Sequence, residues 1–149
     1  AVVCAPVAGE VVALKDVPDE VFSSGVTGDG LAINPSDNKI GAPADGVISA
    51  LLPSKHAVGM TLANGAEILI HVGLNTVMVE GKGFDVKVEE GQEVTAGETL
   101  LTFDRSVIEG AGYSLITPIL VTNADEFASL EKTDAKTVNA GDSLYKIMA

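Results

Sequence analysis

The stretch APVAGEVVAL, residues 5–14, shows the local pattern that decides the fold. It combines an Ala-Pro step, a glycine turn and then an alternating or apolar strand, and the pattern returns at residues 42–51 as APADGVISAL. A second echo links VEEGQEVTAGETLLTF, residues 88–103, with TVNAGDSLYKIM, residues 137–148, since both carry Val, then Ala-Gly-acid, then a strand. Repeated short strands with glycine turns predict a β-sandwich or barrel with internal pseudo-symmetry.

The composition agrees with an all-β fold. Hydrophobic residues make up 46% of the 149 residues and aromatic residues only 4%, so we expect a core of Val, Ile, Leu and Ala. The 16 Gly and 6 Pro are spread along the chain, which favours short strands and tight turns over long helices. Because no linker or low-complexity segment divides the chain, we expect residues 1–149 to form a single domain.

We therefore expect an antiparallel β-sandwich or barrel with a few short helical turns. The expected strands are Val2–Cys4, Gly9–Ala13, Gly30–Pro35, Lys39–Ala42, Gly46–Leu51, Ala57–Leu62, Glu67–Val72, Lys87–Val88, Thr99–Phe103, Ile116–Val121 and Ser143–Lys146. Short helical segments are expected at residues 105–112, with Asp104 as the N-cap, and at residues 123–132.

Charge and terminal sequence limit the classes of partner. The net charge of −12 repels nucleic acid and anionic membrane and favours a basic protein partner, although solubility alone accounts for it equally well. The single cysteine, Cys4, excludes an internal disulfide and a cysteine-based zinc finger. The sequence shows no signal-peptide pattern and no apolar run of about 20 residues, so we expect a cytoplasmic protein. The first residue is not Met, which indicates a processed or trimmed chain.

Both histidines of the chain lie on either side of an Asn-Gly step in SKHAVGMTLANGAEILIHVGLNTV, residues 54–77. Asn-Gly between extended apolar segments is a strong hairpin signal because both residues tolerate positive φ. A two-residue loop places His71 opposite Val58 and makes His56 its diagonal neighbour on the same face, with Cα atoms roughly 7–8 Å apart. A three-residue loop instead shifts the register by one and sends the rings to opposite faces.

Two neighbouring imidazoles serve three kinds of chemistry, and unrelated surface histidines are the alternative to all three. A zinc site needs three or four ligands, and no HxH or HExxH pattern occurs. A hydrolytic triad needs an activated nucleophile, but Ser54 shares a strand with His56 and has no G-x-S-x-G motif. Phosphoryl relay needs two rings, a hydroxyl or backbone donors, no metal and a shallow exposed site. In a relay a neutral imidazole, with an unperturbed pKa near ~6.5, attacks the phosphoryl group.

Further motifs give the sequence a family resemblance that covers nearly the whole chain. In order, they are APVAGEVVAL, DVPDEVF, GDGLAINP, APADGVI, KHAVGM, ILIHVGLNTV, GKGF, EEGQEVTAG and TPILVTN. Their order and spacing resemble the glucose-type IIA (EIIA) domain of the bacterial phosphoenolpyruvate-dependent sugar phosphotransferase system. The resemblance implies a sandwich-like β-barrel with a few short helices. It also implies a phosphotransferase component that works through a phosphohistidine, with no metal or other cofactor.

The resemblance assigns roles by position. His71, in ILIHVG, corresponds to the phosphoryl acceptor, and His56, in KHA, to the residue that orients and stabilises the phosphoryl group. Ser54 corresponds to an assisting hydroxyl. The positions that match the family's partner-docking patch, for which ordinary packing is the alternative, are Phe22, Val26, Leu52, Leu69 and Val77.

By the same resemblance, the phosphoryl donor is the carrier protein HPr and the acceptor is a cysteine of a IIB domain. Asn75 stands where the family commonly has Asp, which weakens one attraction for a basic partner, and Glu20 restores negative charge nearby. The domain is either free-standing or part of a larger membrane permease. Three rival interpretations are a zinc hydrolase, a regulatory binding module, and a biotinyl or lipoyl carrier, for which no lysine occupies a convincing hairpin tip.

Overall fold

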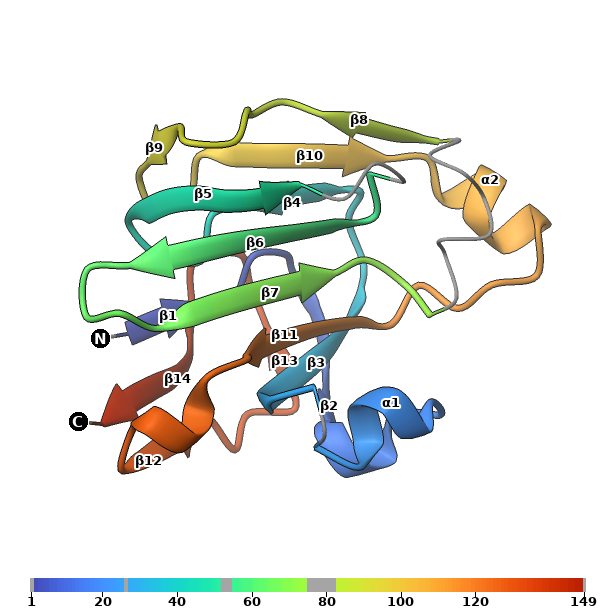
Figure 1. The fold of residues 1–149 in the computed structure, drawn as a ribbon. Coiled ribbons are helices and arrows are strands. Elements are labelled where there is room, and N and C mark those ends of the chain that lie inside the picture. The colour runs from blue at the N-terminus through green and yellow to red at the C-terminus, as the bar shows by residue number, and fades with distance from the viewer. Residues whose placement is uncertain (1, 26, 52–54, 75–82, 149) are drawn as a thin grey trace.

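The computed structural model describes residues 2–25, 27–51, 55–74 and 83–148, which fold mostly into strands (Figure 1). The strands are β1 (Val2–Cys4), β2 (Gly9–Ala13), β3 (Asp29–Pro35), β4 (Lys39–Gly41), β5 (Gly46–Leu51), β6 (Ala57–Leu62), β7 (Glu67–His71), β8 (Phe84–Val86), β9 (Glu93–Val94), β10 (Thr99–Phe103), β11 (Thr117–Val121), β12 (Ser129–Lys132), β13 (Thr137–Val138) and β14 (Ser143–Met148). The short helices are η1 (Leu14–Asp16), α1 (Glu20–Ser23), α2 (Arg105–Gly110) and η3 (Ala124–Glu126).

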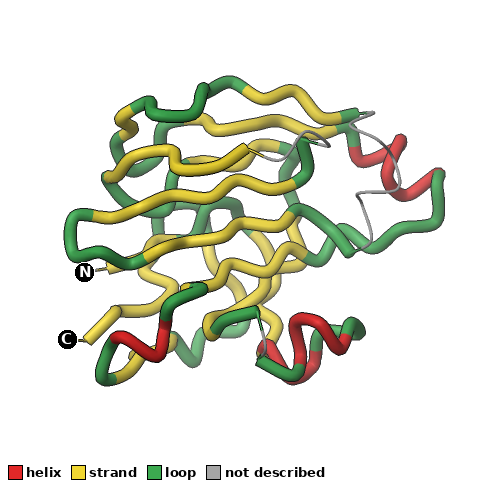
Figure 2. The backbone as a smooth tube through the Cα atoms, in the orientation of Figure 1, coloured by secondary structure: helices red, strands yellow, loops and turns green. Residues whose placement is uncertain are grey.

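The strands form three sheets, and every strand pair among the described residues is antiparallel. The largest sheet has eight strands in the order β13-β2-β3-β11-β7-β6-β5-β9, and two three-stranded sheets have the orders β1-β14-β12 and β4-β10-β8. Figure 2 shows the strands as the body of the molecule, with the helical segments confined to its periphery. The all-β class predicted from the sequence is confirmed.

The pseudo-repeat predicted from the sequence is present in the backbone pairing. The two halves of the eight-stranded sheet have the same strand order when each is read from its edge to the centre. The half β13-β2-β3-β11 thus corresponds, strand by strand, to the half β9-β5-β6-β7. Equivalent backbone hydrogen bonds recur in each half, because Val11 N–H donates to Lys136 O at 2.8 Å and Ile48 N–H donates to Gln92 O at 2.9 Å. The two echoes in the sequence therefore mark two copies of one structural unit.

The two copies are nested and joined where their Ala-Pro segments meet. Cys4 N–H donates to Pro43 O at 2.7 Å, and in return Gly41 N–H donates to Pro6 O at 2.8 Å. The strands β4 to β10 make one continuous copy, and this copy lies in the chain between β3 and β11 of the other. Both histidines belong to the inserted copy.

The core lies on both faces of the large sheet. The main cluster of buried hydrophobic side chains includes Ile119 and Val121, on either side of Leu120 in β11. Because side chains alternate along a strand, Leu120 points to the opposite face, where η1 and α1 cover it. This second cluster consists of Leu14, Val17, Phe22, Ala32, Leu74 and Leu120.

Two of the predicted segments are wrong. The strand expected at Lys87–Val88 is wrong, since β8 ends one residue earlier at Val86. The helix expected at residues 123–132 is also wrong, because only η3 is helical and the segment after it pairs with β14 as β12. The helix after Asp104 is confirmed as α2, with the Asp104 carboxylate accepting a hydrogen bond from Ser106 N–H at 3.0 Å.

Candidate functional site

The candidate site is built around His71, the last residue of β7. Ile68 and Ile70 are buried in the main core, so alternation along the strand turns Leu69 and His71 to the outer face, where both are half-buried. His71 Nδ1 lies 2.7 Å from the carbonyl oxygen of Gly73. Because a carbonyl only accepts, Nδ1 must carry the proton and donate it, which leaves the Nε2 lone pair of the neutral ring available.

The second histidine lies directly against the first. The ring centroids of His56 and His71 are 4.5 Å apart, and the rings meet edge to face at 79°. His56 is only 2% exposed, whereas we expected both rings in a shallow exposed site. The pair therefore consists of one accessible ring and one ring enclosed by protein.

The predicted register of the histidine hairpin is wrong, although the predicted contact between the rings is present. Leu62 N–H donates to Ala66 O at 2.9 Å, so the loop has three residues rather than two. His71 consequently pairs with Ala57, not with Val58. Alternation alone would then place the two rings on opposite faces, so their contact has another cause.

The ring of Phe22 forms another wall of the site. Phe22 comes from α1, and its ring centroid is 5.0 Å from that of His71, with the planes tilted by 57°. Phe22 is 5% exposed because its ring packs in the second cluster with residues such as Leu74 and Leu120. It offers little surface to a partner, so its predicted part in docking stays a prediction.

The surroundings of His71 act on its pKa in opposite directions. Burial disfavours the charged ring and lowers the pKa of His71 below its ordinary value of 6.5. The Gly73 carbonyl and the Asp19 carboxylate act against this, since both favour the protonated ring. Burial has the largest effect, so at neutral pH the ring is uncharged and its Nε2 atom is nucleophilic.

The structure brings some of the predicted site residues together. His56, His71, Phe22 and Leu69 are described, and the His71 ring contacts the rings of both His56 and Phe22. The remaining predictions lie outside the described residues: Ser54, Val26, Leu52 and Val77, together with Asn75.

Sequence reasoning missed two contributors to the site, Gly73 and Asp19. Both lie within motifs quoted for the resemblance, HVG and DVPDEVF, but neither has a side-chain pattern that indicates action on a histidine. Gly73 acts through its backbone carbonyl, and Asp19 is far from His71 in the chain. Three-dimensional placement was needed to identify them.

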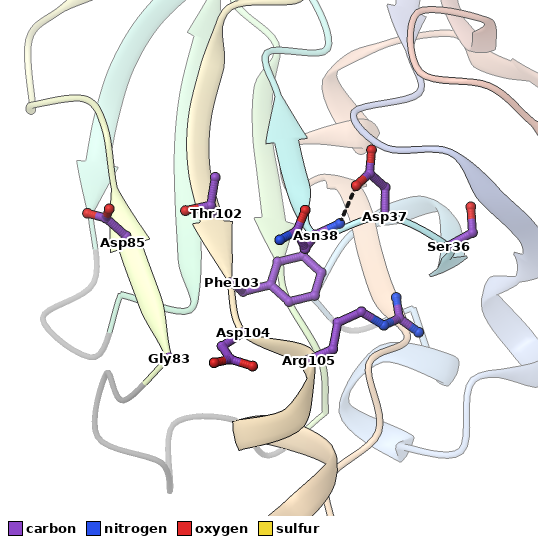
Figure 3. A pocket seen from close by; sticks show the side chains of 9 residues that line it. All are labelled: Ser36, Asp37, Asn38, Gly83, Asp85, Thr102, Phe103, Asp104 and Arg105. Atoms are coloured by element: carbon purple, nitrogen blue, oxygen red, sulfur yellow. Dashed lines mark hydrogen bonds between the residues drawn. The ribbon is translucent and has the colours of Figure 1, made fainter.

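A cavity elsewhere on the molecule does not include the histidines. It has a volume of about 630 Å³, and Figure 3 shows acidic and polar side chains around it, among them Asp37, Asp85 and Asp104. Arg105 is held there by a hydrogen bond from its Nη1 to Pro35 O at 2.6 Å.

Within the described residues, no three His, Cys, Asp or Glu side chains are grouped so that they could hold a metal ion. Nor does any described helix have the length and apolar character of a membrane span.

The comparison with protein families gives one assignment. Residues 1–127 match the family described as phosphoenolpyruvate-dependent sugar phosphotransferase system, EIIA 1. The chain therefore belongs to this family. Membership confirms the resemblance found in the sequence and supports a phosphocarrier role in sugar uptake.

Individual relatives agree with this assignment. The chain is 40% identical to the glucose-specific EIIA component of Staphylococcus epidermidis, over 93% of this chain and 84% of that protein. It is 43% identical to the beta-glucoside-specific EIIBCA component of Halalkalibacterium halodurans, over 97% of this chain but only 23% of that longer protein. Among solved structures, glucose permease IIA from Mycoplasma capricolum matches with a TM-score of 0.90 and 38% identity, over 97% of this chain and 94% of that chain.

Proposed function

We propose that residues 1–149 act as one phosphoryl carrier, which accepts a phosphoryl group on Nε2 of His71 from phosphorylated HPr and passes it to a cysteine of a IIB domain. The observation that carries this proposal is the hydrogen bond from His71 Nδ1–H to Gly73 O at 2.7 Å, next to a second imidazole. It leaves a single nucleophilic nitrogen, in a ring that burial keeps neutral.

The first transfer is a displacement at phosphorus. The Nε2 lone pair of His71 forms the new N–P bond while the N–P bond of the donor phosphohistidine breaks, and that electron pair returns to the donor imidazole. Since Nδ1 keeps its proton, the phosphorylated ring of His71 carries a positive charge, which the Gly73 carbonyl stabilises. In the second transfer the IIB thiolate attacks the same phosphorus, the S–P bond forms, and Nε2 recovers its electron pair.

His56 acts on the phosphoryl group rather than accepting it. An acceptor must reach a group on another protein, and a ring that is 2% exposed cannot do so without rearrangement. The centroid of its ring is 4.5 Å from that of the His71 ring, and His56 is proposed to donate an N–H to the oxygens of a phosphoryl group on Nε2. A hydrogen bond there favours the charge that develops as the phosphoryl group moves. Ser54 is proposed to assist with its hydroxyl.

The surface and the relatives support protein partners for this site. The net charge of −12 speeds association with a basic partner, and a small apolar contact limits the lifetime of the complex, as a relay requires. The apolar contact is proposed to include Leu69, with Phe22, Val26, Leu52 and Val77. Relatives named EIIBCA and EIICBA carry an A component together with B and C components, which supports a IIB partner and a permease context for this cytoplasmic domain.

Labelling with phosphoenolpyruvate, the general phosphotransferase enzyme and HPr tests the proposal. We expect acid-labile, base-stable phosphate on His71 and none in a His71→Gln variant. Glu67→Gln changes an exposed residue on the same face of β7 and is the matched control, expected to label normally. His56→Gln should accept phosphate but pass it to the IIB domain about 100-fold more slowly, in the range that one positioned acid–base group contributes. Normal labelling of the His71→Gln variant would refute the assignment.

A further inference from the structure

The contact between the two histidines conflicts with the register of the strands that carry them. His71 and Ala57 are directly paired, so they share the outer face of the sheet. Val58 and Met60 point the other way and are fully buried in the main core. By the same alternation His56 would join Val58 and Met60 on the core face, away from His71.

The backbone just before His56 shows where this alternation is broken. Lys55 has φ = 64°, and it is the only residue other than glycine with positive φ in the described part of the chain. On its other side His56 is fixed, because its carbonyl oxygen accepts a hydrogen bond from Val72 N–H at 2.7 Å. His56 thus lies between a left-handed residue and the end of a regular ladder. The regular alternation of the strand therefore does not continue through the residue on that side of His56.

We propose that the left-handed backbone of Lys55 is a positioning device, which turns the His56 ring out of the strand's core-facing row and against His71. Its consequence for phosphoryl transfer rests on the function proposed above, whereas its consequence for the ring contact does not. Lys is not a residue that favours positive φ, so the conformation is imposed by the surrounding structure, as is common where strain serves a site. Lys55 is a positioning residue, because it acts through His56.

Substitutions at residue 55 separate the backbone conformation from the lysine charge. Lys55→Val disfavours positive φ because Val is β-branched, while Lys55→Asn and Lys55→Gly tolerate it, and all three remove the charge. Lys39→Val is the matched control, since Lys39 is an exposed lysine in the strand β4, where Val is well tolerated. Thermal unfolding shows whether each variant folds, and Lys55→Thr is a second branched variant should the valine variant not fold.

Two measurements test how the substitutions at residue 55 affect the His56–His71 contact and phosphoryl transfer. The first is the nuclear Overhauser effect between ring protons of His56 and His71, which needs no phosphate. We expect it to weaken in Lys55→Val and to persist in Lys55→Asn, Lys55→Gly and Lys39→Val. The second is the rate of phosphoryl passage to the IIB domain, which we expect to fall about 10- to 100-fold in Lys55→Val, as for a misplaced catalytic group, and to be rescued by Lys55→Asn.

The outcomes distinguish this inference from the proposed function. A valine variant that keeps the ring contact and the wild-type rate would overturn the inference, as would equal losses in the valine, asparagine and glycine variants, since charge would then be the cause. If wild-type protein accepts no phosphate, the proposed function fails, yet the ring contact still tests Lys55. Acceptance of phosphate on His71 should change little in Lys55→Val, so a loss confined to passage supports a role through His56.

Discussion

The His71 imidazole is the residue on which the proposed chemistry depends, and its protonation controls the chemistry. Burial lowers its pKa, while the Gly73 carbonyl and Asp19 raise it by a smaller amount. Nε2 is nucleophilic only in the neutral ring, because protonation uses its lone pair. The site therefore favours the reactive form without excluding proton binding at low pH.

The pH dependence of phosphate acceptance follows from this balance. Since the pKa of His71 lies below 6.5, we expect the rate to be constant at pH 7 and above and to fall as the pH drops through a midpoint below 6.5. Single-turnover labelling across pH measures the midpoint of the rate. A titration of the His71 ring by nuclear magnetic resonance measures the midpoint of its protonation. A midpoint above 6.5 in either experiment would show that Asp19 and the carbonyl outweigh burial.

The sequence predicted that the two histidines touch, but not the geometry that brings them together. The Asn-Gly signal correctly placed His56 and His71 on the two arms of one hairpin, and they do touch. The predicted register was wrong, because the loop has three residues, and the residue before His56, Lys55, has a left-handed backbone. No sequence rule assigns positive φ to a lysine, so that feature could not be predicted.

The helix α1, which carries the Phe22 ring that contacts His71, was not predicted from the sequence. A four-residue helix gives too short a pattern to recognise, and its position depends on contacts made across the fold. The same reason explains β12, which was expected to be helical but is a strand because it pairs with β14. Strands with clear alternation and turn signals, such as Gly9–Ala13 and Ala57–Leu62, have the predicted bounds.

Removal of the Phe22 ring should weaken both the fold and the site. We expect Phe22→Ala to lower the free energy of unfolding by about 3 kcal/mol, because the ring is 5% exposed and packs in the second cluster. The His71 ring, which Phe22 contacts at 5.0 Å, should also become more accessible and titrate closer to its ordinary pKa. Urea unfolding and ring titration measure the two effects. Val47→Ala, at a 37% exposed position, is the control and should cost little.

The close approach of β3 and β11 makes a second prediction at the level of elements. A Cβ atom on Gly30 would lie 2.1 Å from the carbonyl oxygen of Ile119, which is backbone and cannot move aside. We expect Gly30→Ala to lower the free energy of unfolding by about 2 kcal/mol or more, as overpacking does. Gly110→Ala, where a Cβ atom meets nothing within 4 Å, should leave stability unchanged or raise it. Equal stabilities of the two variants would contradict the described packing.

At the scale of the whole molecule, one structural unit occurs twice but carries the histidine pair once. The strand pairing makes Leu120 the counterpart of His71, because Leu120 pairs with Gly30 as His71 pairs with Ala57. Leu120 is fully buried beneath η1 and α1. The segment η1–α1, which covers Leu120, thus also supplies Phe22, the wall of the site against His71 in the inserted copy.

The two copies should unfold together. Strands of both copies share the eight-stranded sheet, and β11 of one pairs with β7 of the other at its centre. Neither copy can therefore bury its part of the core alone, and we expect a single transition in which calorimetric and van't Hoff enthalpies agree. Differential scanning calorimetry measures this. Two separate transitions would show that the copies are independent folding units.

The positions of the two termini make circular permutation of the chain feasible. Val2 pairs with Lys146, so a short linker can join the two ends without crossing the molecule (Figure 1). Opening the closed chain at the exposed connection between β3 and β4 would then yield a circular permutant in which the inserted copy, with both histidines, is made first. Such a rearranged protein would keep every contact of the site, and each copy would become one continuous stretch of chain.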